Sequence, residues 1–562
     1  MTLPGGTRMD DEVYLAGDVD SIQDYVFETS SLPQIRGGSA LLQRCEDAIR
    51  DEKGSLRSRY GFEVLYCAGG SFLLKVKRDL APAVKREIEQ LYRNETLTVT
   101  VTVVYEDGPV VAEQPRLPAD GLDGWALRLV NAARASYEGG DFPLRMAHLM
   151  ARLREAKQSR IHVPFFQAHP FGQRCNRCGK RMVVHIDQEL GERLCQVCHR
   201  RDNEGRRHAD GYDLRGKFNR EFWDVYGSGR RPKQPADLDT LVQKGTRGYL
   251  AFLHADGNDI GRLLGRVRKD SDYKSLSEAL IKVTKDALYD ALNEVCRDQL
   301  EGENTWPFDI LNVGGDDVTL LLHGGYAWEV AVKFLEKFEE RASQHMREIM
   351  RWDDTGTDAH VTASCAIVIA DVKFPVRYMQ RLTKGLLGKA KRTAKARRSS
   401  ALTFLWLPEP VASEHVEPLL SAYETRLGGA ERISLLGRPY TLEQAGVLLE
   451  ASKELARQPR SLRHRWQEVL SKGVMISTSL IAYDIARRKR AEQEVMLTTL
   501  ERLAVTLSPG ASGSRQLSPP VWVLDTSSSD GGPAWRTAFM DALELAELHA
   551  MRPGWESEVS EG

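Results

Sequence analysis

The sequence contains no apolar run long enough to form a membrane-spanning helix, and its first residues, MTLPGGTRMDDEV, lack a signal-peptide core. It has only eight cysteines in 562 residues, without the spacing of a disulfide framework. We therefore expect a cytoplasmic protein that does not enter a membrane. The formal net charge is −1, so the chain as a whole does not attract nucleic acid, and RNA contacts would need local basic patches or partner subunits.

Two adjacent carboxylates, Asp316 and Asp317, lie in the segment NVGGDDVTL between two apolar stretches that are typical of a hairpin. Two carboxylates at a hairpin tip repel each other, which raises the pKa of one of them unless cations lie between them. The segment therefore predicts a divalent metal site. Gly314 and Gly315 would leave backbone room for a phosphate. The alternative is an ordinary turn, since Gly and Asp are common turn residues.

A third oxygen ligand is predicted in the segment GYLAFLHADGNDIGRLL, where an apolar strand ends at Asp256. A turn containing Gly257 follows, and Ile260 and Gly261 open a helix whose backbone N–H groups suit a phosphate. Asp256, Gly257 and Gly261 are thus candidates for binding a metal–nucleotide complex. Asp259 could be a further metal ligand or the N-cap of the helix.

The order of predicted elements around these carboxylates is strand, helix, hairpin, helix, strand, helix. The later elements are a helix over 275–300, a helix over about 327–350, the strand VTASCAIVIA and a basic helix over about 376–398. This order is typical of a ferredoxin-like palm, in which the first strand and the hairpin lie side by side at the centre of the sheet. Asp256, Asp316 and Asp317 would then meet and hold two Mg²⁺ or Mn²⁺ ions about 3.5–4 Å apart for in-line nucleotidyl transfer.

The basic helix contains seven Lys or Arg residues in KGLLGKAKRTAKARR and reaches Arg398. Most of these charges are explained by a solvated helix face. Lys391 is the one that we single out as a candidate to hold a triphosphate. Together with the segment 193–220, this helix is also a candidate basic patch for RNA.

The front of the chain repeats the arrangement in a weaker form. The segment VYLAGDVDSIQDYVF predicts a strand ending in Asp18 and Asp20 before a helix, and EVLYCAGGSFLLKV resembles the later hairpin without its carboxylates. We interpret this as an internal duplication in which the first palm has lost its metal ligands but still offers a nucleotide-binding surface. Gly37, Gly38 and Ser39 are candidates for a phosphate or base loop there.

Four cysteines have the spacing of a structural zinc site. Cys175 and Cys178 form one C-x2-C pair, Cys195 and Cys198 form another, and sixteen residues separate the pairs. Four thiolates close a tetrahedral coordination sphere, so the ion would stabilise folding and take no part in catalysis. A redox dithiol is the competing interpretation. His199 is adjacent but not needed as a ligand.

After about residue 408 the apolar residues recur at three- and four-residue steps, which predicts a helical domain, with Trp466 in its core. The predicted fold class is α+β, with two ferredoxin-like palm domains, a four-cysteine zinc module between them and a C-terminal helical domain. The predicted boundaries are 1–118 for a degenerate first palm, 119–164 for a helical connector, 165–245 for the zinc module and linker, 246–407 for the second palm and 408–562 for the helical domain.

The ordered set GDVDSIQDYVF, IRGGSALL, LYCAGGSFLL, the four cysteines, ADGNDIG, NVGGDD, IVIADVKFPV and LLGKAK resembles the large subunit of type III CRISPR effector complexes, the Csm/Cmr polymerase-cyclase family. The resemblance covers roughly the first four hundred residues. It implies an enzyme that joins ATP into cyclic oligoadenylates when its crRNA-containing complex binds target RNA. Carried over by position, Asp256, Asp316 and Asp317 would bind metal, Lys391 would hold triphosphate and Ser39 would line a nucleotide pocket.

The chain departs from the family pattern in two places. Asn258 stands where many members have the second Asp of an Asp-x-Asp motif, and no His-Asp dipeptide of the family's nuclease domain occurs, so we expect no DNase activity. Two alternatives stay open. One is a free-standing palm cyclase that makes a cyclic dinucleotide, and the other is a catalytically silent scaffold subunit.

Overall fold

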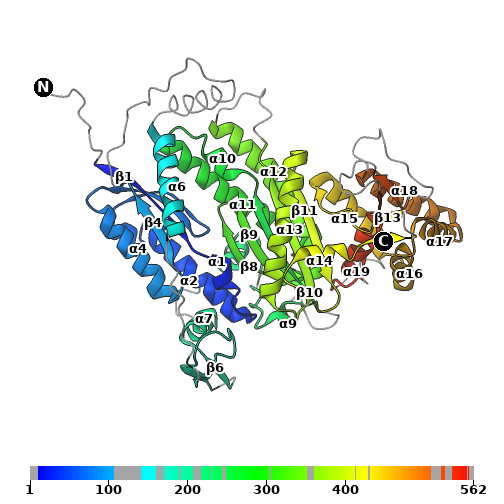
Figure 1. Ribbon diagram of the computed structural model, residues 1–562, viewed down its shortest axis with the longest axis horizontal. Helices are drawn as coiled ribbons and strands as arrows, with labels where there is room; N and C mark the ends of the chain where they lie inside the picture. Colours follow the sequence, from blue (N-terminus) through cyan, green and yellow to red (C-terminus); the bar gives the residue numbers. More distant parts are fainter. Residues whose placement is uncertain are drawn as a thin grey trace, which may run out of the picture.

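The computed structural model describes residues 11–106, 141–159, 169, 171–188, 191–206, 217–229, 231–242, 248–302, 305–350, 360–411, 413–427, 431–507, 520–525, 534–553 and 555. These residues form two mixed α/β bodies side by side, with a small cysteine-containing module beneath the first and a mainly helical body at the far end (Figure 1). The predicted α+β class, with a four-cysteine module between two palms, is confirmed.

The first palm is a four-stranded antiparallel sheet in the order β2-β3-β1-β4. Its strands are β1 (Glu12–Val19), β2 (Glu63–Ala68), β3 (Ser71–Lys77) and β4 (Val101–Tyr105). Its helices are α1 (Ile22–Val26), α2 (Leu32–Arg50), α3 (Ser55–Tyr60) and α4 (Ala81–Thr96). Successive strand residues point to opposite faces, so Leu15 packs with α2 and α4, whereas Tyr14 packs with α6 (Asp141–Ser159) on the other face.

The second palm has the predicted order of elements. They are β7 (Tyr249–Gly257), α10 (Ile260–Leu264), α11 (Asp270–Gly302), β8 (Phe308–Gly314), β9 (Asp317–His323), α12 (Gly324–Met350), β10 (Ala363–Asp371) and α13 (Val376–Arg397). The sheet order is β14-β11-β10-β7-β9-β8, with β11 (Ala401–Leu407) and β14 (Tyr440–Thr441) added beside β10. As expected, the hairpin lies beside β7: its strand β9 pairs with β7 in the interior of the sheet, and β8 forms the edge.

The internal duplication is visible in backbone detail. Ser21 and Asp259 are the N-caps of the five-residue helices α1 and α10, and both have φ = 55°. In the first palm Asp18 is in register with Ser71, and in the second palm Asp256 is in register with Asp317. The structure therefore aligns Asp18 with Asp256 and puts a serine hydroxyl where the second palm has a hairpin carboxylate.

The cysteine module packs on the first palm through α7 (Gln196–Arg206), which follows the short strands β5 (His185–Asp187) and β6 (Glu192–Leu194). The expectation that Gly37, Gly38 and Ser39 form a loop was wrong, since all three lie within α2. A Cβ on Gly37 would overlap the carbonyl of Arg201 on α7, so this glycine permits close helix packing. The side chain of Arg201 is fully buried and donates to the backbone carbonyls of Val26 and Gln34.

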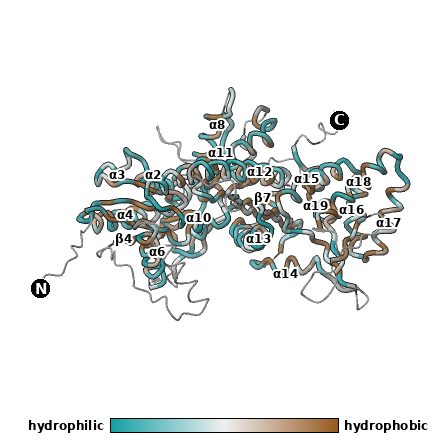
Figure 2. Tube along the Cα trace, turned by 90° about the horizontal axis from the view of Figure 1, so that it is seen from above, coloured by the Kyte–Doolittle hydropathy of each residue, from teal (hydrophilic) through white to brown (hydrophobic). Residues whose placement is uncertain are grey.

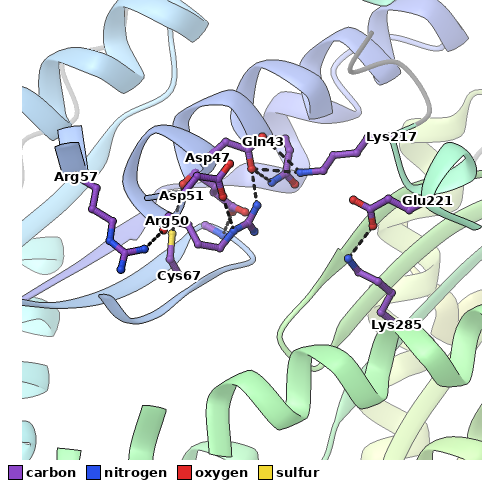
Figure 3. Close-up of polar contacts among 11 residues, drawn as sticks. Gln43, Asp47, Arg50, Asp51, Arg57, Cys67, Lys217, Glu221 and Lys285 are labelled. Atoms are coloured by element: carbon purple, nitrogen blue, oxygen red, sulfur yellow. Dashed lines mark hydrogen bonds and ion pairs between the residues drawn. The ribbon is translucent and has the colours of Figure 1, made fainter. Parts of the chain in front are cut away.

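Charged contacts connect the first palm to the linker that follows the module. Asp47 on α2 accepts hydrogen bonds from Gln43 and Arg50 of its own helix and pairs with Lys217 at the start of α8 (Lys217–Tyr226) (Figure 3). Glu221 of α8 pairs with Lys285 of α11 at 2.7 Å. Helix α8 thus contacts both palms, and a one-turn helix α9 (Leu238–Leu241) precedes the second.

The C-terminal body contains α14 (Val416–Ser421), α15 (Leu442–Ala456), α16 (Arg460–Leu470), α17 (Val474–Ala486), α18 (Arg490–Leu507) and α19 (Phe539–His549). Trp466 is fully buried, as predicted. A small sheet in the order β12-β13-β16-β15 was not predicted. Its strands are β12 (Glu424–Leu427), β13 (Glu431–Ser434), β15 (Val523–Asp525) and β16 (Ala534–Arg536).

Hydrophilic and hydrophobic segments alternate along the helices (Figure 2), as expected of helices that each bury one face. The four cysteines outside the module, Cys45, Cys67, Cys296 and Cys365, are buried in the cores as predicted. Within the described part of the chain, no helix combines the length and the hydropathy needed to cross a membrane.

Two buried histidines at the contact between the second palm and the C-terminal body make an acid-sensitive joint. His549 and His323 are 1% and 2% exposed, and burial, assisted by the charge of Arg552, lowers their pKa values to about 3 and about 4. Unfolded histidine binds a proton near pH 6.5, so the unfolded state binds more protons below that pH. The free energy of unfolding therefore falls as the pH drops from about 6.5 toward 4.

We expect His549→Leu to remove one of these two contributions. Between pH 6.5 and 5 the variant should lose about 2 kcal/mol less stability than the parent, because one depressed pKa costs about 1.4 kcal/mol per pH unit. Urea unfolding at several pH values measures this difference. Leu545→Ala offers a control, because it changes a buried residue of the same helix that carries no proton, so it should lower stability without changing the parental pH dependence. Identical slopes for the parent and His549→Leu would contradict the assignment.

Candidate functional site

Three carboxylates meet where β7 and β9 lie side by side. Asp256 is near the end of β7, Asp317 begins β9, and Asp316 occupies the turn between β8 and β9. Asp256 and Asp317 are directly in register, and the N–H of Gly257 donates to the backbone carbonyl of Asp316 at 3.2 Å. The structure therefore brings together the three side chains that the sequence singled out.

The surroundings make these carboxylates difficult to ionise together. Burial, together with the charges of Asp256 and Asp317, raises the pKa of Asp316 to about 7. Burial also raises the pKa of Asp317, although the nearby His254 acts in the opposite direction. A bound cation would favour the charged form of both groups, so the electrostatics of the cluster suit a divalent ion.

One oxygen of this cluster accepts no hydrogen bond from the described residues, although a ring nitrogen of His254 lies 3.1 Å from it. Asp317 Oδ2 accepts from Asn312 Nδ2 at 3.3 Å, whereas its buried Oδ1 makes no hydrogen bond within the described part of the chain. A buried carboxylate oxygen without a donor is costly, and a cation would compensate for the missing donor. The residues present therefore fit Mg²⁺ or Mn²⁺, the ions expected for oxygen ligands.

Lys391 forms an ion pair with one carboxylate of the cluster. The Lys391 ammonium on α13 forms an ion pair with Asp256 Oδ2. Among the described residues, only the four cysteines bring three or more ligand atoms within 4.8 Å of one another, so the carboxylates are not yet assembled around one point. Cation binding at Asp256 would have to compete with the Lys391 ammonium.

The glycines of the hairpin do not serve the expected purpose. A Cβ on Gly314 would lie 2.7 Å from the backbone nitrogen of Gly69, and one on Gly315 would lie 2.6 Å from the hydroxyl of Tyr66. Both neighbours belong to the hairpin of the first palm, so the backbone room that we expected for phosphate is filled by protein. Gly315, with φ = +63°, also needs the left-handed conformation that glycine adopts readily.

The other two glycines differ from each other. A Cβ on Gly257 would contact Asp316, so this position keeps the chain close to the carboxylate cluster. Gly261 on α10 faces open space. Asp259 is exposed, makes no side-chain capping bond and pairs with Arg262 at 3.1 Å, so the structure does not bring it into the cluster.

A cavity of about 560 Å³ opens between the two palms beside the carboxylates. It is lined from the second palm by Asp256 and Asp317 and from the first palm by Ser39. Ser39 donates its hydroxyl to the carbonyl of Leu311 on β8 at 2.5 Å, which fixes α2 against the second palm. Lys384 of α13 also lines the cavity. The sequence did not distinguish Lys384 from the other lysines of α13.

Among the polar residues of this cavity that were missed are Gln23, His254 and Gln380. His254 lies two residues before Asp256 on β7, so the two-residue period of a strand could have placed it on the same face. Gln23 and Gln380 carried no local signal, because α1 and α13 approach each other only in the folded chain.

In the first palm, a lysine lies beside the two carboxylates at the end of strand β1. Lys157 of α6 forms an ion pair with Asp18 and lies 3.6 Å from Asp20. Ser71 donates its hydroxyl to Asp18 at 2.6 Å. An ammonium group thus neutralises both carboxylates, which agrees with the expectation that the first palm binds metal poorly.

The four module cysteines come together as predicted, and all four are buried. Their sulfur atoms lie within 4.8 Å of one another, so the cluster could hold a metal ion. His199 does not join them. Its ring stacks on His185 with 3.9 Å between the ring centroids.

Comparisons with known proteins agree with this geometry. Residues 249–401 match the family model described as Cas10/Cmr2, second palm domain. A chain in the crystal structure of the Csm1-Csm4 cassette in complex with cA3 is 13% identical with a TM-score of 0.52, and the alignment covers 97% of this chain and 70% of that one. A chain in the crystal structure of the Csm1-Csm4 cassette in complex with cA4 is 14% identical with a TM-score of 0.48. That alignment covers 96% of this chain and 70% of the other. The curated proteins contain no match. At these identities, the first structural likeness bears on the fold alone.

Proposed function

With residues 249–401 matching the Cas10/Cmr2 second palm domain, we propose that this chain is a metal-dependent nucleotidyltransferase. Its reaction would join ATP through 3′-5′ linkages into cyclic oligoadenylates. The observation that carries the proposal is the cluster of Asp256, Asp316 and Asp317, with one buried oxygen that accepts no hydrogen bond within the described part of the chain, at the edge of a cavity between two palms.

The chain's own residues would divide the work as follows. Asp256, Asp316 and Asp317 would hold the ions, whose chemistry is to activate a 3′-hydroxyl and stabilise the leaving pyrophosphate. Lys391 would leave Asp256 when the ions bind and would neutralise triphosphate instead, while Lys384 adds a second positive charge at the cavity. Ser39, Gly257 and Gly261 would line the path of the nucleotide. Gly314 and Gly315 would act indirectly by seating the hairpin against the first palm.

We propose zinc as the ion of the four-cysteine cluster. Four buried thiolates complete a tetrahedral sphere and leave no open position for a substrate. The ion would therefore act in folding, by fixing α7 against α2.

We further propose that the chain works inside a type III CRISPR complex that contains crRNA and is activated by target RNA. A cavity of about 1000 Å³ between the module and the two palms supports RNA contact. Its basic lining residues are Arg36, Arg177, Arg206, Arg220, Arg231, Lys233 and Lys373, against two acidic ones, Asp237 and Asp239. The structural neighbours are crystallised as Csm1-Csm4 cassettes, so other subunits are reasonable partners.

The test is incubation of the purified protein with each labelled NTP and Mg²⁺ or Mn²⁺, alone and with partner subunits, crRNA and target RNA. Products are resolved by mass spectrometry. We expect cyclic oligoadenylate from ATP, dependent on the metal ion and stimulated by target RNA. A cyclic dinucleotide formed by the chain alone would favour the free-standing cyclase instead. No product from the assembled complex with a verified target would leave the scaffold alternative.

A further inference from the structure

A chain of polar contacts leads from the first palm to the carboxylate Asp317 of the second. Gln380 Nε2 of α13 donates to Gln23 Oε1 of α1 at 2.5 Å, and Gln23 Nε2 lies 3.5 Å from His254 Nε2. On the other side of the ring, His254 Nδ1 lies 3.1 Å from Asp317 Oδ1. The first palm thus contributes one side chain, Gln23, between two elements of the second.

The surroundings assign the proton of the His254 ring. Nδ1 faces the carbonyl of Val318 at 3.2 Å, the hydroxyl of Thr319 at 3.0 Å and Asp317 Oδ1. A carbonyl and a carboxylate can only accept, so we place the proton on Nδ1. Nε2 is then an acceptor and faces the amide N–H of Gln23. The hydrogen bonds thus run from Gln380 through Gln23 to His254, whose Nδ1–H is held by Val318 and Thr319 and lies at ion-pair distance from Asp317.

The contacts restrict the imidazole from both sides. His254 is 8% exposed and Gln380 is 6% exposed, so neither side chain can leave without exposing a cavity. The Nδ1 of His254 lies 3.1 Å from Asp317 Oδ1, the buried oxygen that has no hydrogen bond within the described part of the chain. A group that holds a carboxylate in place without binding the ion itself can change metal affinity by about 10–100-fold.

We propose that Gln23 of the first palm is a positioning residue for the second palm, acting through His254 on the metal-binding oxygen of Asp317. The inference rests on the proposed function, because it assumes that Asp317 binds a divalent ion. The first palm, which lacks a hairpin carboxylate pair of its own, would then help to position the carboxylates of the second palm. Aligning α1 with α10 places Gln23 opposite Gly261, because each residue follows the first isoleucine of its helix. Glycine has no side chain, so the second palm has no counterpart of Gln23.

The test is Mn²⁺ binding by the full-length, zinc-loaded protein, followed by electron paramagnetic resonance of free Mn²⁺. Gln23→Met keeps the side-chain length but removes both hydrogen-bonding atoms, and we expect it to weaken Mn²⁺ binding about tenfold. The matched control is Gln43→Met. Gln43 lines the same cavity, but its amide donates to Asp47 on its own helix (Figure 3), so this variant should bind Mn²⁺ like the parent.

Two substitutions of His254 separate positioning from packing. His254→Asn keeps a polar atom near the place of Nδ1 but none at Nε2, and we expect its affinity to lie between those of the parent and His254→Leu. Because asparagine cannot reach Gln23, adding Gln23→Met to His254→Asn should cause no further loss, which a double-mutant cycle detects as non-additivity. Thermal unfolding of each variant shows whether the fold is retained, and Gln380→Met replaces Gln23→Met if the latter does not fold.

The outcomes are distinguishable. Loss of Mn²⁺ binding in Asp317→Ala, with weakened binding in Gln23→Met and His254→Leu, supports the inference. If Asp317→Ala loses Mn²⁺ but Gln23→Met binds it like Gln43→Met, the proposed metal site stands and the positioning role is refuted. If Asp317→Ala binds Mn²⁺ as the parent does, the metal site itself is wrong and the positioning role is overturned with it.

Discussion

Replacing Asp316 and Asp317 together by alanine is expected to abolish nucleotide-product formation while the protein remains folded. Both carboxylates belong to the proposed cation site, and without them the site would not hold the cations whose positive charge stabilises the leaving pyrophosphate. We expect a loss of at least about 10³-fold, the scale of electrostatic stabilisation in enzyme sites. Folding should be spared, because burial raises the pKa of both groups and their charges therefore oppose the metal-free fold.

The first palm supplies a matched control for this experiment. Asp18 occupies the position of Asp256, but its partners are Lys157 and Ser71, and it does not line the cavity between the palms. Asp256→Ala should remove activity, whereas Asp18→Asn should retain it. Product formation by the Asp316/Asp317 double variant within tenfold of the parent would show that the carboxylate cluster is not the catalytic centre.

The central part of the site could be predicted because its signals are local. Asp256 ends an apolar strand, and Asp316 and Asp317 follow a Gly-Gly pair, so strand periodicity and turn composition place all three near one edge of a sheet. The register of Asp256 with Asp317 then follows from antiparallel pairing of β7 and β9. The family resemblance points to the same three residues.

The errors come from contacts between segments far apart in the chain. Gly37 lies in a helix and not in a loop. It is a glycine because the carbonyl of Arg201 on α7 occupies the place that a side chain would need. Gly314 and Gly315 meet Gly69 and Tyr66 of the first palm, which no local pattern of the hairpin reveals. Glycine in a sequence shows that space is needed, but only the fold shows whether a phosphate or another backbone fills it.

The same limitation explains what was not foreseen in the C-terminal body. Strands β13 and β16 pair in parallel although about a hundred residues separate Ile433 from its partner Trp535. Strands of three or four residues are too short to show a two-residue period, so the helices around them dominated the prediction. Long helices such as α15 were predictable because several turns repeat the same apolar pattern.

Loss of one module cysteine is expected to have the largest effect on folding. In Cys175→Ser the remaining three thiols cannot complete a tetrahedral site, and structural zinc in isolated fingers contributes about 10–16 kcal/mol of apparent binding free energy. That exceeds or equals the total stability of a typical domain, about 5–15 kcal/mol. The effect should reach the first palm, because Arg201 on the module helix α7 is fully buried and bonds to Val26 and Gln34 there.

Soluble yield, bound zinc and thermal unfolding of Cys175→Ser measure this effect. We expect most of the soluble protein to be lost and any remainder to be zinc-free, with an early unfolding transition. Cys296→Ser is the control, because Cys296 is a buried thiol on the core face of α11 but is far in sequence from the module. It should keep its zinc and lose only the modest stability of a core substitution, about 0.5–3 kcal/mol. A soluble, zinc-free Cys175→Ser protein with parental stability and activity would refute a structural role, because the contact between α7 and α2 would then hold without the ion.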